Sequence, residues 1–278
     1  MSTTLTISAA DVNKLRQMTG AGMMDCKKAL MEAGGDFEKA IDELRKKGQK
    51  VAANRADREA KEGYIIAKTN ADSTKGYLIA ISCETDFVAK SEGYVKFAND
   101  VLEIAMKNNP SGIDALKLLP MENVTVGDKL IDQVGKIGEK IELTRYEVIE
   151  APKVVIYIHP GNRVVSMVGM SSATATTEAG KDVAMQIAAM NPVAIDKDDV
   201  DQKTLDREIE IGKEQARAEG KPETMIEKIA LGKLNKFYNE STLLNQAFIK
   251  DDKKNIRQYL DSVEKGLTVK VFKRVQIG

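Results

Sequence analysis

The sequence predicts an α+β protein with a small N-terminal three-helix domain, a duplicated α+β core with antiparallel sheets, and an inserted helical hairpin. Apolar residues recur at helical spacing in three short segments near the N-terminus, which predicts the helices. Two later segments superpose without a gap after a shift of 86 residues, which predicts the duplication. We expect boundaries at 1–48 for the three helices, 49–62 for a linker, 63–150 for the first core unit, 151–200 with 240–278 for the second, and 201–239 for the hairpin.

Composition and charge exclude several classes of function. Lys+Arg and Asp+Glu number 42 each in 278 residues, so no basic field favours nucleic acid or a membrane surface, and partners are expected to be proteins. Met1 to Ala10 contains neither a basic start nor an apolar segment, and no apolar stretch is long enough to cross a membrane, so we expect a cytoplasmic protein. Cys26 and Cys83 lack C-x-x-C spacing and are interpreted as reduced, mostly buried thiols.

The first N-terminal helix has a clear start signal. Ser8 followed by Asp11 predicts a capping box, and Val12, Leu15 and Met18 then share one face of the helix. The next two helices are expected over Met23 to Ala33, stopped by Gly34-Gly35, and over Phe37 to Lys47, capped by Asp36 and stopped by Gly48.

Adjacent methionines open the second helix. Helical neighbours lie about 100° apart, so Met23 and Met24 can hardly both face a narrow core, and at least one is expected at the surface. Partial packing of both against Leu15 and Leu44 is an equally open alternative.

Each core copy combines a β-hairpin, an amphipathic helix and a last alternating strand. The first copy is expected to comprise strands Tyr64 to Lys68 and Tyr77 to Cys83, helix Glu92 to Met106, and strand Lys140 to Ile149. The second comprises strand Val154 to Ile158, a strand from Val164, a helix from Glu178, and strand Thr268 to Ile277. Short helices are also expected over Ile113 to Leu119 and Val126 to Val134, the latter capped by Thr125 with Asp128.

The segment Glu84 to Lys90 lies between a predicted strand and a predicted helix. Phe87 either folds back into the core or is held out for a partner. The 86-residue shift places Ser172-Ala173 opposite Asp86-Phe87, so the scaffold does not need the acid or the ring. This difference favours a role in recognition for Phe87, while Asp86 acts either on the partner or only to order its own loop.

The insertion predicts two charged helices joined at Glu219 to Pro222. Either the hairpin projects from the core and meets a partner, or it lies along its own domain.

The residues offer no set for an enzyme, a metal or a cofactor. His159 is the sole histidine and has no second His or Cys at metal-ligand spacing. The sequence contains no P-loop, and Gly20-Ala21-Gly22 lies between helices, which is typical of a turn. Recognition of another protein therefore remains, through the Met23-Met24 face, the Asp86-Phe87 segment and the His159 loop.

Two of these regions form part of longer motifs, Leu15 to Leu30 and Thr85 to Ala89. On these motifs, and on Met190-Asn191-Pro192, Gly220-Lys221-Pro222 and Glu227 to Phe237, the chain resembles bacterial elongation factor Ts over essentially its whole length. The resemblance implies a guanine-nucleotide exchange factor without covalent chemistry. Such a factor binds elongation factor Tu carrying GDP, disrupts its Mg²⁺ and phosphate site, and promotes GDP release so that GTP can bind.

The resemblance also implies roles for particular residues. Thr85, Asp86, Phe87 and Val88 would dislocate the magnesium site of Tu, while Arg16, Met23 and Met24 would contact its nucleotide domain and His159 its far domain. The N-terminal domain would be UBA-like, the hairpin would be the coiled coil of the family, and complexes could be 1:1 or 2:2. No further C-terminal helical module is expected after the last strand. The alternative is a structural or RNA-associated scaffold that acts through the hairpin.

Overall fold

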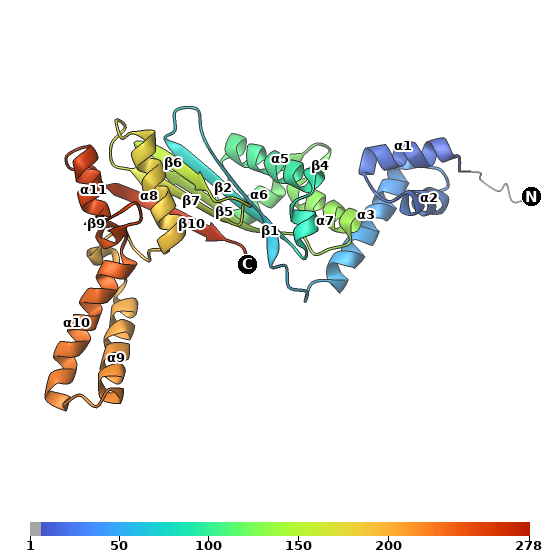
Figure 1. Ribbon diagram of the computed structural model, residues 1–278. Helices are drawn as coiled ribbons and strands as arrows, with labels where there is room; N and C mark the ends of the chain where they lie inside the picture. The colour runs from blue at the N-terminus through green and yellow to red at the C-terminus, as the bar shows by residue number, and fades with distance from the viewer. Residues whose placement is uncertain (1–6) are drawn as a thin grey trace, which may run out of the picture. The chain divides into compact units, whose positions relative to one another are not determined.

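The computed structural model describes residues 7–278 and divides the chain into two compact units. Unit 1 comprises the described part of the chain up to residue 66 together with residues 78–147 and 277–278, and unit 2 comprises residues 67–77 and 148–276. Figure 1 labels the helices and strands of both units. Residues 1–6, which carry part of the predicted 1–48 domain and of the expectation about the N-terminus, lie outside the described residues.

Unit 1 begins with the three predicted helices, α1 (Ala9–Thr19), α2 (Met23–Glu32) and α3 (Phe37–Asn54). The Ser8 cap is confirmed, because its hydroxyl accepts a hydrogen bond from the Asp11 backbone N–H at 3.1 Å. A small apolar core holds the helices together and consists of Val12, Leu15, Cys26, Ala29, Leu30 and Ala40. Met18, which was predicted to share a face of the helix with Val12 and Leu15, is 57% exposed at the end of α1.

The predicted end of the third helix at Gly48 is wrong. Helix α3 passes through Gly48 and packs on α7 (Val126–Ile137). A Cβ on Gly48 would lie 2.9 Å from the Ile131 carbonyl oxygen, and one on Gly135 would lie 2.9 Å from the Gly48 Cα. The glycine therefore allows two helices to approach closely, and this packing overrides its local tendency to end a helix.

The first three-stranded sheet has the order β1-β2-β5, formed by β1 (Glu62–Thr69), β2 (Lys75–Cys83) and β5 (Glu142–Glu150). Helix α5 (Glu92–Asn108) buries an apolar face and is tied to β2 by Tyr94, whose hydroxyl donates to the Ile81 carbonyl at 2.8 Å. Helix α7 starts with the predicted capping box of Thr125 and Asp128. Helix α6 (Ile113–Leu118) and the short pair β3 (Pro120–Met121) and β4 (Val124–Thr125) precede it.

The second sheet, in unit 2, is antiparallel with the order β10-β7-β6. Its strands are β6 (Lys153–Ile158), β7 (Val164–Met170) and β10 (Val269–Gln276), and α8 (Thr177–Met190) packs on β6 and β7. The second strand of each copy is the central one in both sheets, so the 86-residue repeat corresponds to a repeated topology. Mixed helices and antiparallel strands confirm the α+β class.

The inserted helices are α9 (Gln202–Ala218) and α10 (Glu223–Ser241). They pack against each other where Gly212 meets Ala230, and Figure 1 shows them extending away from the sheet of the same unit. The alternative in which the hairpin lies along its own domain is therefore wrong. The chain returns through elements that the sequence did not predict: η2 (Leu243–Asn245), β8 (Ala247–Phe248), β9 (Asp251–Asn255) and α11 (Ile256–Val263), with η1 (Lys197–Asp199) before the hairpin.

Candidate partner-binding surface

The segment after β2 is exposed, and we call residues 84–89 the tip. Residues Asp86–Ala89 make a single helical turn, α4, in which Ala89 is buried and Phe87 is 84% exposed. Of the two alternatives for Phe87, the structure shows the ring held out in solvent. An aromatic ring on a short, anchored turn offers a partner a large apolar surface, and little side-chain entropy is lost when the partner binds it.

Asp86 pairs within this turn. Its carboxylate accepts a hydrogen bond from the Lys90 ammonium at 2.6 Å, which lowers the pKa of Asp86. The carboxylate therefore stays ionised at neutral pH. Thr85, the residue that precedes the turn, makes no side-chain capping bond to it.

The base of the tip contains Glu84, which is held from two directions. Arg55, which follows α3, donates from one guanidinium nitrogen to both carboxylate oxygens at 2.7 and 2.9 Å, and the Lys140 backbone N–H donates at 2.7 Å. Partial burial would raise the pKa of Glu84, but these hydrogen bonds and the Arg55 charge outweigh it, and the pKa lies below its ordinary value. Glu84 thus connects the tip to two other segments of unit 1.

Cys83 lies beneath the tip at the end of β2. Its thiol donates to the Thr85 carbonyl at 3.1 Å, and burial raises its pKa to about 11. A thiol with that pKa is almost entirely protonated at neutral pH and is a poor nucleophile. Cys83 therefore supports the backbone of the tip and offers no covalent chemistry.

A second exposed apolar surface lies on the N-terminal helices, and we call Met18, Met23 and Met24 the methionine surface. Met23 is 57% exposed and Met24 is 73% exposed, so both adjacent methionines face solvent, and the alternative in which they pack on Leu15 and Leu44 is wrong. Arg16 is exposed in the last turn of α1. Unbranched thioether side chains adapt to many partner shapes.

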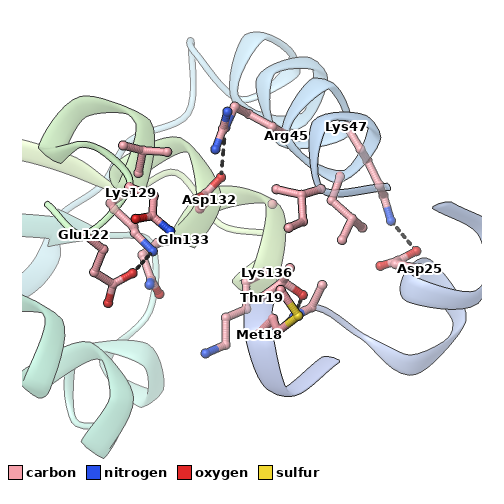
Figure 2. Close-up of a pocket in the computed structure, with 16 residues that line it drawn as sticks. Met18, Thr19, Asp25, Arg45, Lys47, Glu122, Lys129, Asp132, Gln133 and Lys136 are labelled. Atoms are coloured by element: carbon pink, nitrogen blue, oxygen red, sulfur yellow. Dashed lines mark hydrogen bonds and ion pairs between the residues drawn. The ribbon is translucent and has the colours of Figure 1, made fainter. Parts of the chain in front are cut away.

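A cavity of about 220 Å³ lies next to this surface, between the N-terminal helices and α7. Figure 2 shows Met18 and Thr19 at one side of it and the ion pairs Asp25–Lys47, Arg45–Asp132 and Glu122–Lys129 around it. Burial raises the pKa of Asp132, although the Arg45 charge opposes this change. The first pair links α2 to α3 and the second links α3 to α7, while the third joins Glu122, between β3 and β4, to α7.

His159 begins the turn between β6 and β7 in unit 2. Its backbone N–H donates to Val164, the Asn162 N–H donates to the His159 carbonyl, and Gly161 takes φ +90° to close the turn. The exposed imidazole Nδ1 lies 3.1 Å from the Tyr157 hydroxyl. A cavity of about 240 Å³ adjoins these residues and is lined further by Val164, Met185, Ala188, Ala189 and Ile249.

The structure brings the predicted site residues together only in part. Asp86 to Val88 lie in the turn α4, and Thr85 directly precedes it. Arg16, Met23 and Met24 lie on α1 and α2 of the same unit, whereas His159 belongs to unit 2. Sequence reasoning missed Arg55 and Glu139, which contact the base of the tip. The only signal available was their charge near predicted element ends, which many other residues share.

Two kinds of feature are absent from the described part of the chain, a metal-binding cluster of side chains and a membrane-spanning helix. Within residues 7–278, no three His, Cys, Asp or Glu side chains gather to hold a metal ion. No helix of that region combines the length and apolar character that a membrane crossing requires. Exposed apolar side chains on two anchored surfaces are typical of a protein that acts by binding another protein.

Comparison with known proteins agrees with this class. The family model described as elongation factor TS matches residues 84–278. The chain is 54% identical to elongation factor Ts of Cytophaga hutchinsonii, over 98% of this chain and 99% of the relative. It is 53% identical to that of Christiangramia forsetii and 45% identical to that of Porphyromonas gingivalis, each over at least 98% of both chains. The chain belongs to the elongation factor Ts family.

Family membership assigns the chain to translation elongation, as a nucleotide exchange factor whose partner is elongation factor Tu. The alternative of a structural or RNA-associated scaffold is not favoured.

Proposed function

We propose that this chain accelerates GDP release from elongation factor Tu by inserting Phe87 next to the magnesium and phosphate site of that partner. The observation that carries the proposal is the 84% exposure of Phe87 on a turn whose base is anchored by Glu84 and Ala89. In the free protein, this ring makes little contribution to folding that could explain its presence. On a partner, an aromatic ring of this size is a typical binding hot spot.

The physical mechanism requires no covalent step. GDP is held by backbone donors around its phosphates and by Mg²⁺ that bridges the phosphates to the protein, so displacing either element weakens nucleotide binding. Linkage makes the coupling reciprocal: the factor lowers the affinity of Tu for nucleotide by the same ratio as nucleotide lowers the affinity of Tu for the factor. Incoming GTP then displaces the factor, which can act again.

The remaining predicted residues would hold the partner in place. Arg16, Met23 and Met24 would contact the nucleotide domain of Tu, and His159 would contact its far domain. Exposure of the methionine surface and of the His159 turn supports these assignments. Asp86 would act with Thr85 and Val88 at the magnesium site, and its pairing with Lys90 also gives it a part in ordering its own turn.

The finer architecture belongs to the same proposal. The N-terminal helices would form a UBA-like domain, and α9 and α10 would form the coiled coil. The boundaries would be those predicted, 1–48, 49–62, 63–150, 151–200 with 240–278, and 201–239, except that α3 continues past Gly48 into the predicted linker as far as Asn54. The factor would work in the cytoplasm without direct nucleic-acid contact, in a 1:1 or 2:2 complex with Tu.

Release of a fluorescent GDP analogue from Tu tests the proposal. Wild type is expected to accelerate release strongly, and Phe87→Ala to lose a hot-spot contribution of about 2–4 kcal/mol, or roughly 30- to 1,000-fold in rate at limiting factor. Because Phe87 is exposed, the urea midpoint of Phe87→Ala should match that of wild type.

Leu118→Ala is the matched control, since Leu118 is an exposed apolar residue of unit 1 that the proposal does not use. Its exchange rate should equal that of wild type. Equal rates for Phe87→Ala and wild type would refute the role of Phe87, and a wild type that never accelerates release would refute the exchange mechanism.

A further inference from the structure

We infer that Glu139 is a positioning residue for exchange, which sets the direction in which the chain enters the tip and so orients Phe87. This inference rests on the proposed function, because it assigns Glu139 an effect on the partner only through Phe87. Glu139 directly follows Gly138, the residue that ends α7 with φ +79°.

The Glu139 carboxylate binds the start of the tip at three points. One oxygen, Oε2, accepts the backbone N–H of Glu84 at 3.1 Å and that of Thr85 at 3.0 Å. The other, Oε1, accepts the Thr85 hydroxyl at 2.6 Å. Hydrogen bonds to an ionised acceptor are among the stronger ones in proteins, and these fix both the backbone and the side chain of Thr85.

The contact is reciprocal. While Glu139 accepts from the backbone of Glu84 and Thr85, the Glu84 carboxylate accepts from the backbone of Lys140 at 2.7 Å. Two neighbouring residues of one segment therefore bind two neighbouring residues of the other. Rotation or sliding of the tip relative to the end of α7 would break several of these bonds at once.

The tip needs this support because α4 cannot stabilise itself. A single turn fixes several dihedral angles for very few hydrogen bonds, so short isolated helices are unstable in water. Thr85 occupies the capping position of α4 but makes no capping bond from its side chain, and its hydroxyl instead donates to Glu139. The residue that follows Gly138 thus holds the backbone that leads into the turn, and the turn itself has no side-chain cap from Thr85.

Helix α7 is a firm support for this contact. It opens with a capping box, and it buries Val126, Leu130 and Val134 in unit 1. An anchor that directly follows the end of such a helix holds Phe87 in one direction before the partner arrives. Pre-organisation of this kind lowers the entropy cost of binding and is expected to appear in the exchange rate.

We call the three hydrogen bonds from Glu84 and Thr85 to the Glu139 carboxylate the clamp. The chemistry of these bonds predicts different results for two substitutions of Glu139. Glu139→Ala removes all three acceptor contacts. Glu139→Gln can keep them in number, because its amide oxygen accepts both backbone N–H groups and its amide nitrogen donates to the Thr85 hydroxyl oxygen. A positioning role therefore predicts loss with alanine and rescue with glutamine.

The test uses the full chain and fluorescent-GDP release from Tu at limiting factor. We expect Glu139→Ala to lower the exchange rate about 10-fold or more, because it removes all three contacts to Glu84 and Thr85. Glu139→Gln should remain within about 3-fold of wild type, because its amide can keep those contacts. Glu59→Ala is the control, because it removes an exposed carboxylate of the same unit that pairs with Lys61 and has no part in the proposed surfaces. The exchange rate with this control variant should equal that of wild type.

A double-mutant cycle separates positioning from a general loss of structure. In the Phe87→Ala background, Glu139→Ala should cause little further loss, because there is no ring left to orient. Equal losses in both backgrounds would overturn the inference, as would wild-type rates for Glu139→Ala.

Hydrogen exchange of the free chain tests the clamp without the partner. The amides of Glu84 and Thr85 should be protected in wild type and Glu139→Gln, and should lose protection in Glu139→Ala. If wild type fails to accelerate GDP release from Tu although the Glu84 and Thr85 amides are protected, the proposed function is refuted, and the positioning role with it. If wild type and Glu139→Ala accelerate GDP release from Tu equally well, the positioning role alone is refuted.

Discussion

Replacing Gly135 with alanine tests the close packing of α3 on α7. The new Cβ would lie 2.9 Å from the Cα of Gly48. Carbon atoms pack best at about 3.5–4.0 Å, so this contact is too short by roughly 0.6–1.1 Å. Both helices must move, because the atom in the way belongs to the backbone and cannot rotate aside.

Two opposing free energies decide the result. Overpacking a tight contact costs about 1–3 kcal/mol, and the upper half of that range applies when the obstacle is backbone. Alanine also favours the helix by about 1 kcal/mol relative to glycine. We therefore expect a net destabilisation of about 1–2 kcal/mol for Gly135→Ala, or roughly 5- to 30-fold in the equilibrium between packed and separated helices.

Gly232→Ala is the matched control. Gly232 lies inside α10, and an added Cβ there would meet no atom within 4 Å. Only the gain in helix propensity remains, so this substitution should stabilise its helix by up to about 1 kcal/mol. The two glycine-to-alanine changes are thus predicted to have opposite signs.

Urea unfolding followed by circular dichroism measures whether each substitution lowers or raises the free energy of unfolding. Hydrogen exchange of the α3 and α10 amides then assigns each change to its helix. Faster exchange in α3 with a lower urea midpoint is the expected result for Gly135→Ala. An increase in stability equal to that of Gly232→Ala would show that α3 and α7 are not in close contact, and would refute the reasoning.

Two further predictions concern the base of the tip. The lowered pKa of Glu84 means that its ionised form stabilises the fold above the pKa of the unfolded chain, about 4.3, and that this contribution is lost as pH falls through the lower folded pKa. The difference in urea midpoint between wild type and Glu84→Gln should therefore be largest near neutral pH and shrink below about pH 4; a constant difference would contradict this. Cys83, buried and with a pKa raised to about 11, should resist iodoacetamide in the native chain and react after unfolding in urea, and rapid native labelling would contradict its burial.

Local chemistry was readable from the linear sequence. The Ser8 cap and the capping box of Thr125 with Asp128 involve residues three apart, so their partners are adjacent in the chain and the structure confirms both. The repeated strand and helix pattern also predicted the strands that the structure then places at the centre of the two sheets. These features depend on short-range geometry that the order of residues specifies directly.

The site was predicted in part. The second copy of the repeat has Ser172-Ala173 where the first has Asp86-Phe87, and this difference predicted a role in recognition for Phe87. The structure then showed that the Phe87 ring is exposed. The single turn of α4 was not predicted, because four residues carry too little periodicity to indicate a helix.

Only the tertiary structure decided which distant segments meet. Gly48 reads locally as a helix stop, yet it continues α3 because Gly135, far along the chain, leaves room for close packing. Glu139 reads as one of many charged residues, yet it holds Thr85 from a position 54 residues away. A single sequence specifies propensities between neighbours, whereas the free energy of these contacts arises only when packing brings the segments together.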